Sequence, residues 1–510
     1  MRPSNRREFF LDSARISAAL TAAGLIGPRA SEARAATPSP KADPIDRMRV
    51  AVIGTGGRGG DHVNGFLDKS LNCEIVAICD CDERNSQQKL RTIERIQGKA
   101  PHAEKDLRRI IDDKSIDAVS IATPNHWHSL AAIWAIQSGK HVYVEKPVSH
   151  NVSEGRRVVE AARKYNKICQ TGTQCRTFSG TRDAMQFIHD GKIGKVHTGF
   201  GLCYKDRKSI GKIQGVGMIP WSLDYDLWCG PAPKRDPHRL KVHYDWHWQW
   251  DYGNGDLGNQ GIHQMDVARW GLGKKEMPKS VFSLGGRFGY EDDGETANTQ
   301  LAVFDYGDCE LIFEVRGLLP TPDYLADRRG KSTDDETRRV RVGNVFLGEK
   351  GYVLCVNYNY SVALDHDDNV LQVFGRYRGG EGHAHYENFT QAVRAGRREM
   401  LNADIEEGHL SSALCHLANI SYRLGHEIPF DSQETKVIKG PGGEDKLATE
   451  SLQHMRKHLE DKKVDLSKVQ CRVGPKLELD PKNERFVSNA DANKMLTREY
   501  RKGFEVPARI

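Results

Sequence analysis

The sequence predicts an α/β protein with two domains, a doubly wound parallel sheet followed by an α/β domain whose sheet is largely antiparallel. Three observations support this prediction. An apolar strand enters a glycine-rich turn near residue 54, strand and helix patterns alternate as far as residue 168, and half-alternating strands dominate from there to residue 432. A chain of 510 residues is also too long for one ordinary core.

The glycine-rich turn has the pattern G-x-G-x-x-G, and its residues are Gly54, Thr55, Gly56, Gly57, Arg58 and Gly59. In this pattern the first glycine permits a tight turn, the second lets the backbone approach a diphosphate, and the third lets helix and strand pack closely. The diphosphate would lie on the free N–H groups at the start of the following helix. The strand before the turn and the helix after it favour a dinucleotide site over an ordinary glycine loop.

Asp80 ends the next apolar strand, about 20 residues after the last glycine of the turn. A carboxylate there can accept hydrogen bonds from the ribose of the adenosine, and it would repel a 2′-phosphate. The sequence therefore predicts NAD as the cofactor rather than NADP. Arg84 lies close enough to leave NADP as the alternative.

Residues 1–35 resemble a twin-arginine signal peptide, with Arg6 and Arg7 before a mildly apolar segment and a small-x-small site at 33–35. The apolar segment is too short for a membrane span. The segment holds six arginines and three acidic residues, so half of the formal net charge of +6 lies in it. The near-neutral remainder argues against nucleic acid as a partner. Export to the periplasm would favour a tightly bound cofactor, and residues 36–47 would form a linker.

Residues 48–168 are predicted to form the first domain because strands and helices alternate there, as in a doubly wound sheet. The expected strands are 49–53, 74–80, 118–122 and 141–144. The expected helices are 60–67, 83–97, 107–112, 127–138 and 153–165. In such folds the ligand crevice lies at the carboxyl ends of the strands, so functional residues are expected directly after each strand.

Two of the expected strands are followed by candidate functional residues. After the strand at 118–122 come Thr123, Pro124, Asn125 and His128, which we expect to line the nicotinamide and its ribose, with Trp127 used for packing. After the strand at 141–144 come Glu145, Lys146 and Pro147. The glycine turn, the ATPNHWH segment and the GKHVYVEKP segment together resemble the glucose–fructose oxidoreductase / inositol dehydrogenase / MocA (Gfo/Idh/MocA) family, over residues 48 to about 430.

The resemblance implies an NAD(P)-dependent oxidoreductase of sugars, polyols or related compounds. It also implies a second domain with an open-faced antiparallel sheet, an active site between the two domains, and association of identical chains through that sheet. Lys146 and Glu145 would then belong to the cofactor and catalytic site. Pro147 restricts Lys146 to an extended backbone conformation. The ammonium of Lys146 at the cleft would stabilise the negative charge that develops on the oxygen of an alcohol as it loses hydride. The alternative is a structural ion pair with Glu145.

The second domain is predicted to span residues 169–432, with strands at 200–204, 281–285, 299–304, 310–316, 340–347 and 351–356 and closing helices at 386–395 and 405–424. Arg176 is a candidate substrate contact, with a surface arginine as the alternative. The aromatic segments 221–231 and 244–250 are mostly expected in cores or interfaces. Trp250 is the candidate for stacking on the C–H face of a sugar.

The segment 255–266 resembles the D-x-x-x-H-x-x-D element of the family, in which the histidine is the acid/base for the substrate hydroxyl. His263 and Asp266 match this element, but Asn259 stands where the family has an acid that supports the histidine. Asn259 can orient a ring but cannot stabilise its cation by charge, and Asp256 is the candidate replacement. No H-x-x-x-H or H-E-x-x-H helix is present, so no metal site is expected. Residues 433–510 are predicted to be a polar extension without chemistry.

The sequence thus predicts an exported NAD-dependent oxidoreductase in which His263 takes the hydroxyl proton and Lys146 polarises the oxygen. Two other functions stay open. A glycoside hydrolase or lyase could oxidise its sugar transiently and return the hydride. The related hydrolases tend to have valine where Lys146 stands, which favours simple redox. The second alternative is a ligand-binding protein without catalysis.

Overall fold

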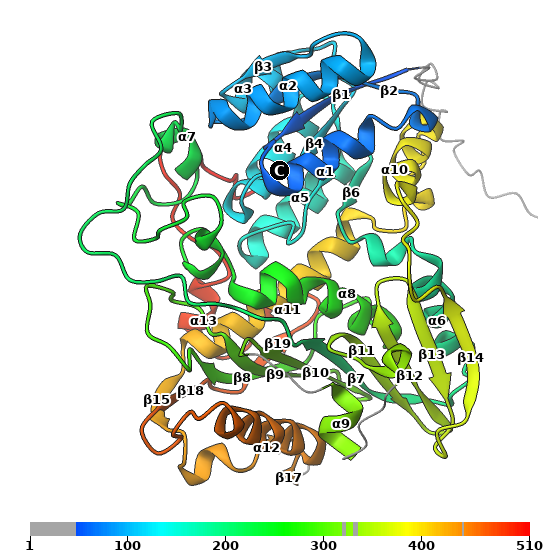
Figure 1. Ribbon diagram of the computed structural model, residues 1–510, viewed down its shortest axis with the longest axis vertical. Coiled ribbons are helices and arrows are strands. Elements are labelled where there is room, and N and C mark those ends of the chain that lie inside the picture. Colours follow the sequence, from blue (N-terminus) through cyan, green and yellow to red (C-terminus); the bar gives the residue numbers. More distant parts are fainter. Residues whose placement is uncertain (1–46, 319–322, 330–334, 441–442) are drawn as a thin grey trace, which may run out of the picture. The chain divides into compact units, whose positions relative to one another are not determined.

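The computed structural model describes residues 47–510 except 319–322, 330–334 and 441–442. The predicted signal peptide and nearly all of the linker lie outside the described residues. None of the described helices combines the length and apolar character that crossing a bilayer requires. The predicted fold class is confirmed: a six-stranded parallel sheet is followed by a larger, mostly antiparallel sheet (Figure 1).

The first sheet is fully parallel and has the strand order β3-β2-β1-β4-β5-β6, the doubly wound arrangement. Its strands are β1 Met48–Ile53, β2 Cys73–Cys79, β3 His102–Glu104, β4 Ala118–Ile121, β5 His141–Val144 and β6 Cys169–Thr171. Its helices are α1 Gly57–Phe66, α2 Glu83–Gln97, α3 Leu107–Asp112, α4 Asn125–Gln137 and α5 Val152–Lys164. The sixth strand lies just past residue 168, where we expected the first domain to end.

Both faces of the first sheet are covered by helices. Helices α1 and α2 pack on one face together with α10 (Ala384–Ala395), which comes from much later in the chain. Helices α3, α4 and α5 cover the other face, and Phe504 and Val506 from the C-terminal segment complete that core. Strands buried on both faces need continuous apolar sequences, which explains the β-branched runs of β1 and β4.

The second sheet contains twelve strands in the main order β14-β13-β12-β11-β7-β10-β9-β8-β18-β15, with β19 also paired to β8. Only β7 and β10 pair in parallel within that order. Its strands are β7 Val196–Cys203, β8 Ser280–Gly286, β9 Thr299–Asp305, β10 Glu310–Arg316, β11 Val342–Gly348, β12 Gly351–Asn357, β13 Tyr360–Leu364, β14 Val370–Gly375, β15 His426–Pro429, β18 Gln470–Val473, β19 Leu477–Asp480 and β20 Arg485–Phe486. The pair β16 Lys439–Gly440 and β17 Gly443–Glu444 is separate.

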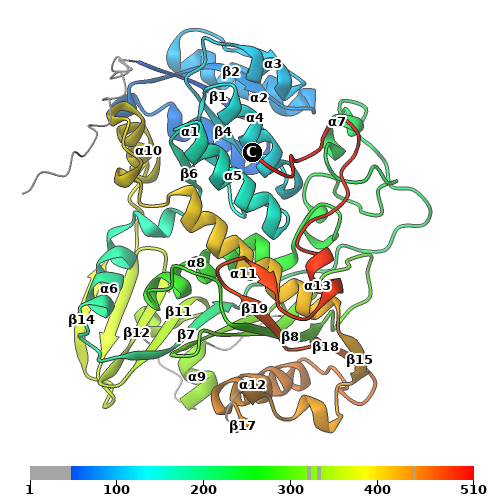
Figure 2. The ribbon, with the colours of Figure 1, turned by 180° about the vertical axis from the view of Figure 1, so that it is seen from behind.

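Helices cover both faces of this sheet as well. On the side toward the first domain lie α6 Ser179–His189, α8 Ile262–Gly271 and α11 Ile405–Arg423 (Figures 1 and 2). On the opposite side lie α9 Tyr324–Arg329 and α12 Lys446–Asp461. Leu452, Met455 and Leu459 of α12 are buried against this side of the sheet.

Two predictions about the second domain therefore need correction. The outer face of the sheet is only partly open, because α12 of the same chain covers part of it. The segment 433–510, predicted to be a polar extension, is packed into the second domain. Strands β18 and β19 pair with β8, which comes from a much earlier part of the chain, and Cys471 is buried in the core.

Candidate active site

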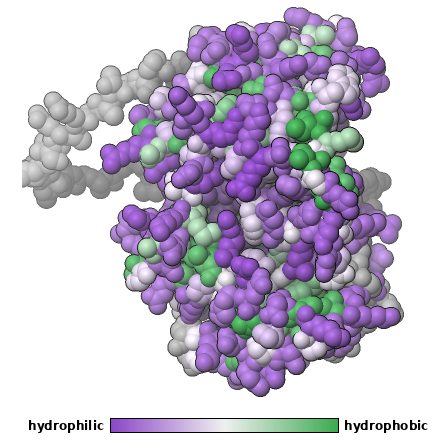
Figure 3. Space-filling view, turned by 90° about the vertical axis from the view of Figure 1, so that its left-hand side faces the viewer, coloured by the Kyte–Doolittle hydropathy of each residue, from purple (hydrophilic) through white to green (hydrophobic). Residues whose placement is uncertain are grey.

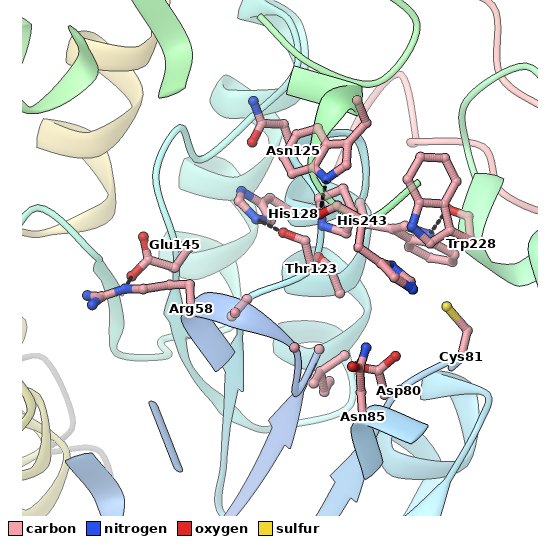
Figure 4. Close-up of a pocket in the computed structure, with 18 of the residues that line it drawn as sticks. Arg58, Asp80, Cys81, Asn85, Thr123, Asn125, His128, Glu145, Trp228 and His243 are labelled. Carbon is pink, nitrogen blue, oxygen red and sulfur yellow. Dashed lines mark hydrogen bonds and ion pairs between the residues drawn. The ribbon is translucent and has the colours of Figure 1, made fainter. Parts of the chain in front are cut away.

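A cavity of about 410 Å³ opens at the carboxyl ends of β1, β2, β4 and β5, where the doubly wound fold places a ligand. It is lined by most of the predicted cofactor residues, namely Gly54, Gly56, Gly57, Arg58, Asp80, Thr123, Pro124, Asn125, His128, Glu145 and Lys146, and by Asn259 from the second domain. Figure 4 shows Asp80 and Asn85 on one side of it, the Arg58–Glu145 pair on another, and His128 with Thr123 between them.

The glycine turn has the shape that a dinucleotide requires. Gly54 has a φ of +80°, and a Cβ at Gly59 would lie 1.8 Å from the Gly54 carbonyl oxygen, so both positions need glycine. Helix α1 begins inside the turn, at Gly57, three residues earlier than expected. Gly56 precedes it without a side-chain cap, so the N–H groups of the first turn stay available to a diphosphate.

Asp80 is placed by the turn itself. Its Oδ2 atom accepts hydrogen bonds from the backbone N–H of Thr55 (2.8 Å) and from the Thr55 hydroxyl (3.1 Å). Thr55 is fully buried and does not line the cavity, so its role is to hold the carboxylate. Asp80 lies on the cavity wall, where it can meet a ribose. The donor set and the geometry therefore fit NAD.

Glu145 is a buried carboxylate whose charge is balanced within the first domain. Its Oε1 atom accepts a hydrogen bond from Arg58 Nε (2.8 Å) and lies 3.0 Å from His62 Nε2. Burial alone would raise the pKa of Glu145, but the Arg58 guanidinium and the His62 ring hold that pKa well below its usual range. Glu145 is thus ionised and paired with Arg58, which frees the neighbouring lysine from that pairing.

Lys146 reaches from the end of β5 to the second domain. Its Nζ atom donates a hydrogen bond to the backbone carbonyl of Asn259, at 2.7 Å. That carbonyl belongs to a π-helical turn, Leu257–Gly261, directly before α8. Burial lowers the pKa of Lys146 to about 8, although the charge of Glu145 opposes the shift. The ammonium therefore sits in the cavity where the two domains meet.

His263 lies on the first turn of α8 and is 6% exposed. His263 does not line the cavity. The centre of its ring lies 5.1 Å from the centre of the Tyr358 ring. Its Nδ1 atom is buried and has no hydrogen-bond partner among the residues that the structure describes. Burial lowers the pKa of His263 well below its usual value, and the ammonium of Lys146 lowers it further. The ring is therefore neutral and its free nitrogen is available to a substrate hydroxyl, but the lowered pKa makes it a weaker base than an exposed histidine.

Asp256, the candidate acid in place of Asn259, is paired with an arginine. Its Oδ1 atom accepts a hydrogen bond from Arg207 Nε at 2.7 Å, and the pair is buried. Asp256 is thus paired with Arg207 through Oδ1, while its buried Oδ2 has no hydrogen-bond partner among the described residues. Within the described part of the chain, no three His, Cys, Asp or Glu side chains converge in an arrangement suited to a metal ion.

Two predicted substrate contacts need correction. Arg176 is buried and forms a bidentate pair with Asp266 (2.8–3.0 Å) and an ion pair with Glu407 (3.0 Å), so it joins elements of the second domain. Trp250 lies outside the cavity, under the guanidinium of Arg423 at 4.9 Å. The sequence did not indicate these contacts, because the residues that Arg176 and Trp250 contact lie far from them along the chain.

His128 has a structural role in addition to lining the cavity. Its ring nitrogens lie 2.7 Å from the Thr123 carbonyl oxygen and 2.6 Å from the Pro147 carbonyl oxygen. The ring therefore joins the loops that follow β4 and β5, and so fixes the two segments that carry the candidate functional residues.

The sequence did not reveal a segment that we call the strap, residues 222–252, which forms the second wall of the cavity. It contains α7 (Tyr225–Cys229) and lines the cavity with Leu227, Trp228, His243, Tyr244, Trp246 and His247. The sequence showed that this segment is rich in aromatic residues, but we selected Trp250 from it as the substrate contact and not the residues that line the cavity.

The strap is attached to the loop that follows Asp80. Backbone hydrogen bonds join Asp224 to Cys81 (2.9 Å) and Glu83 to Ser222 (3.2 Å), and His243 Nε2 lies 2.8 Å from Asp82 Oδ2. The strap side of the molecule is mostly hydrophilic, with a few apolar patches (Figure 3). Just before the strap, Trp221 is 81% exposed, yet the Arg84 guanidinium covers its ring at 5.2 Å. The hydrogen bonds between the strap and this loop lie beside Asp80, at the end of the cavity where the adenosine of a dinucleotide would bind.

Comparison with known proteins agrees with this geometry. Residues 48–173 match the model of the GFO_IDH_MocA oxidoreductase family with its NAD-binding Rossmann fold, and residues 158–330 match the C-terminal alpha/beta domain of the same family. A glycosyl hydrolase family 109 protein of Shewanella pealeana is 33% identical over 180 residues, which cover 32% of this chain and 38% of that protein.

Two further similarities come from dehydrogenases. A myo-inositol 2-dehydrogenase of Thermotoga maritima is 31% identical over 258 residues, which cover 50% of this chain and 64% of that protein. The solved structure of a levoglucosan dehydrogenase in complex with NADH and levoglucosan shares the fold, with a TM-score of 0.52, 18% identity, and coverage of 73% of this chain and 97% of that one. The chain spans less than two thirds of both sequence relatives. The two domain models together cover more than half of it, and the chain belongs to the Gfo/Idh/MocA family of oxidoreductases.

Proposed function

We propose that the protein is an NAD-dependent oxidoreductase that oxidises a hydroxyl group of a sugar, a polyol or a sugar derivative. The observation that carries this proposal is the position of the Lys146 ammonium, which bridges from the nucleotide domain to the turn before His263. The dehydrogenase relatives act on inositol and levoglucosan by their names, which supports a carbohydrate substrate.

The side chains of the site divide the work of alcohol oxidation. A bound nicotinamide would supply the acceptor for the hydride. Lys146 holds a positive charge beside the oxygen on which negative charge develops, which stabilises the transition state. His263 is neutral near pH 7 and accepts the hydroxyl proton. Asn259 fixes the lysine through its main-chain carbonyl, which any residue type could supply.

The strap supports our further proposal that the cofactor is tightly bound. A dinucleotide in the cavity would lie between the glycine turn and a wall that is hydrogen-bonded to the loop after Asp80. Its release would then require these contacts to open. The measurement is the nucleotide content of the purified protein, with a dissociation constant below micromolar expected for NAD and a weaker one for NADP.

The activity is tested by releasing and identifying the nucleotide and then screening sugars and polyols while following the absorbance of the reduced cofactor. Net reduction that persists with substrate is the expected result. A Lys146→Met variant should lose it, and the exposed Lys99→Met is the matched control. Full activity in Lys146→Met would overturn the catalytic role of this lysine, and no turnover with any sugar would favour a non-catalytic binding protein.

A second candidate function is glycoside cleavage with internal recycling of the hydride, which the similarity to a glycosyl hydrolase family 109 protein favours. Oxidation of one ring hydroxyl to a ketone acidifies the adjacent C–H bond, so the glycosidic oxygen can leave by elimination. Addition of water and return of the hydride then restore the sugar. The same absorbance experiment distinguishes the two functions, because this cycle shows transient reduction with release of the leaving group.

We also propose that the chain is exported by the twin-arginine route, on the basis of the segment around Arg6 and Arg7 alone. Replacement of both by lysine should retain the protein in the cytoplasm. Fractionation of cells that express the full chain, probed with an antibody, tests this, and equal export of the variant would contradict it.

A further inference from the structure

A second lysine lies beside Lys146, on the exposed side of the turn that precedes His263. Lys205 follows β7, and its Nζ atom donates a hydrogen bond to Gln260 Oε1 at 2.7 Å. Lys146 donates to the carbonyl of Asn259, the residue directly before Gln260, also at 2.7 Å. The two ammonium groups are thus held by consecutive residues of the same π-helical turn, directly before the candidate acid/base His263.

Neither ammonium forms an ion pair with a carboxylate in the described ranges 47–318, 323–329, 335–440 and 443–510; both are held by neutral oxygen atoms. The nearby carboxylates are already used. Glu145 is paired with Arg58, and Asp256 is paired with Arg207. Neither ammonium therefore has a carboxylate partner of its own, although the charge of Glu145 still acts on Lys146 and that of Asp256 on Lys205.

Burial lowers the pKa of Lys146, and the charges of Lys205 and Arg207 contribute to the lowering. Lys205 likewise contributes to the lowered pKa of His263. Lys205 itself is exposed, so solvent screens part of this repulsion, and an anionic group bound between the two ammonium groups would offset both charges.

We propose, on the basis of the function proposed above, that the substrate is an anionic sugar whose carboxylate or phosphate is bound by Lys205, next to the hydroxyl that Lys146 and His263 act on. Lysine presents a point charge that either oxyanion can use, so the shared chemistry is an anionic oxygen group on the sugar. Gln260 supports this arrangement, because its Nε2 atom donates to the Tyr358 hydroxyl at 2.6 Å while its Oε1 atom accepts from Lys205.

The first test measures binding by the intact protein with its nucleotide. Isothermal titration with glucuronate, glucose 6-phosphate and glucose distinguishes a carboxylate, a phosphate and a neutral sugar of similar size. At least one anion should bind about 10-fold or more tightly than glucose. Binding of the anion should also be accompanied by proton uptake near pH 8, seen as a dependence of the heat on the buffer, because the ligand raises the pKa of Lys146. Equal binding of all three sugars without proton uptake would overturn the proposal.

The second test uses Lys205→Gln, which keeps a polar side chain of similar length but removes the charge. The preference for the anionic over the neutral sugar should fall by about 10-fold or more, in binding and in kcat/KM. Lys208→Gln removes an exposed lysine three residues later and should keep the preference. An unchanged preference in Lys205→Gln would overturn the inference while leaving the oxidoreductase proposal intact. Absence of turnover with every sugar, charged or neutral, would instead count against the oxidoreductase.

Discussion

The Nζ atom of Lys146 lies 2.7 Å from the main-chain carbonyl oxygen of Asn259. This single contact joins the end of β5 in the first domain to the turn that leads into α8 in the second. The ammonium is held by a neutral oxygen rather than by a carboxylate, so its charge stays available to a substrate oxygen.

Replacement of Lys146 by methionine should lower kcat/KM by about 100- to 1000-fold, because the charge that stabilises the oxygen in the transition state is lost. Steady-state kinetics on a turned-over sugar measure the change. Methionine is close to lysine in length, so the cavity keeps its shape. A loss confined to KM would contradict the role, since it would indicate uniform binding rather than stabilisation of the transition state.

The pKa of Lys146, lowered to about 8 by burial, predicts the pH dependence of oxidation. The ammonium is present below this pH and is lost above it, so kcat/KM should decline as the pH rises through about 8. Lys146→Arg should lose this decline, because an arginine stays charged to above about pH 12. A rate that rises through pH 8 in the wild type would show that the neutral amine is the active form, which would make Lys146 the base.

Replacement of His243 by alanine should speed the release of the reduced cofactor by about 2- to 10-fold, which corresponds to the loss of one partly exposed hydrogen bond of about 0.5–1.5 kcal/mol. His243 joins the strap to Asp82 at 2.8 Å, beside the adenosine end of the cavity. Stopped-flow fluorescence measures the release rate. His238→Ala, an exposed histidine in the same strap, is the control, and equal rates in both variants would exclude the strap as the barrier to release.

Glu484 should stabilise the fold through His409 and Arg156. Burial would raise the pKa of Glu484, but the hydrogen bonds from His409 (3.0 Å) and Arg156 lower it to about 2. A carboxyl whose pKa is lower in the folded state contributes stability above its unfolded pKa, about 4.3, and loses it as the pH falls toward 2. Glu484→Gln should therefore cost about 1–3 kcal/mol at pH 7.

The measurement for Glu484→Gln is urea unfolding at pH 7 and at pH 3, beside the exposed control Glu478→Gln. The difference between Glu484→Gln and the wild type should shrink at the lower pH. A difference that stays constant with pH would show that the ionised carboxylate is not its source.

Local patterns predicted the first domain well. The turn at Gly54, the acid at Asp80 and the residues after β4 and β5 depend on neighbours in the sequence, so their positions at the cavity could be foreseen. The short strands β3 and β6 and the helix α6 were missed. The acidic partners of Arg176 and the strand that pairs with β18 both come from distant parts of the chain. Such pairings are created by tertiary folding, and no local pattern shows them.

The strap shows the same limit in the site itself. Its aromatic content was visible, but the choice of Trp250 relied on composition alone. The strap is attached to the loop after Asp80 by main-chain hydrogen bonds and by the contact of His243 with Asp82, and composition alone does not indicate such attachments.

Phe504 and Val506, which complete the core on one face of the first sheet, are synthesised long after the strands they cover. While the chain emerges from the ribosome, the nucleotide domain therefore keeps an apolar surface around Trp127 exposed until the second domain has also been made. Removal of residues 496–510, or a bulky fusion that displaces them, should accordingly destabilise the first domain, which lies at the other end of the sequence.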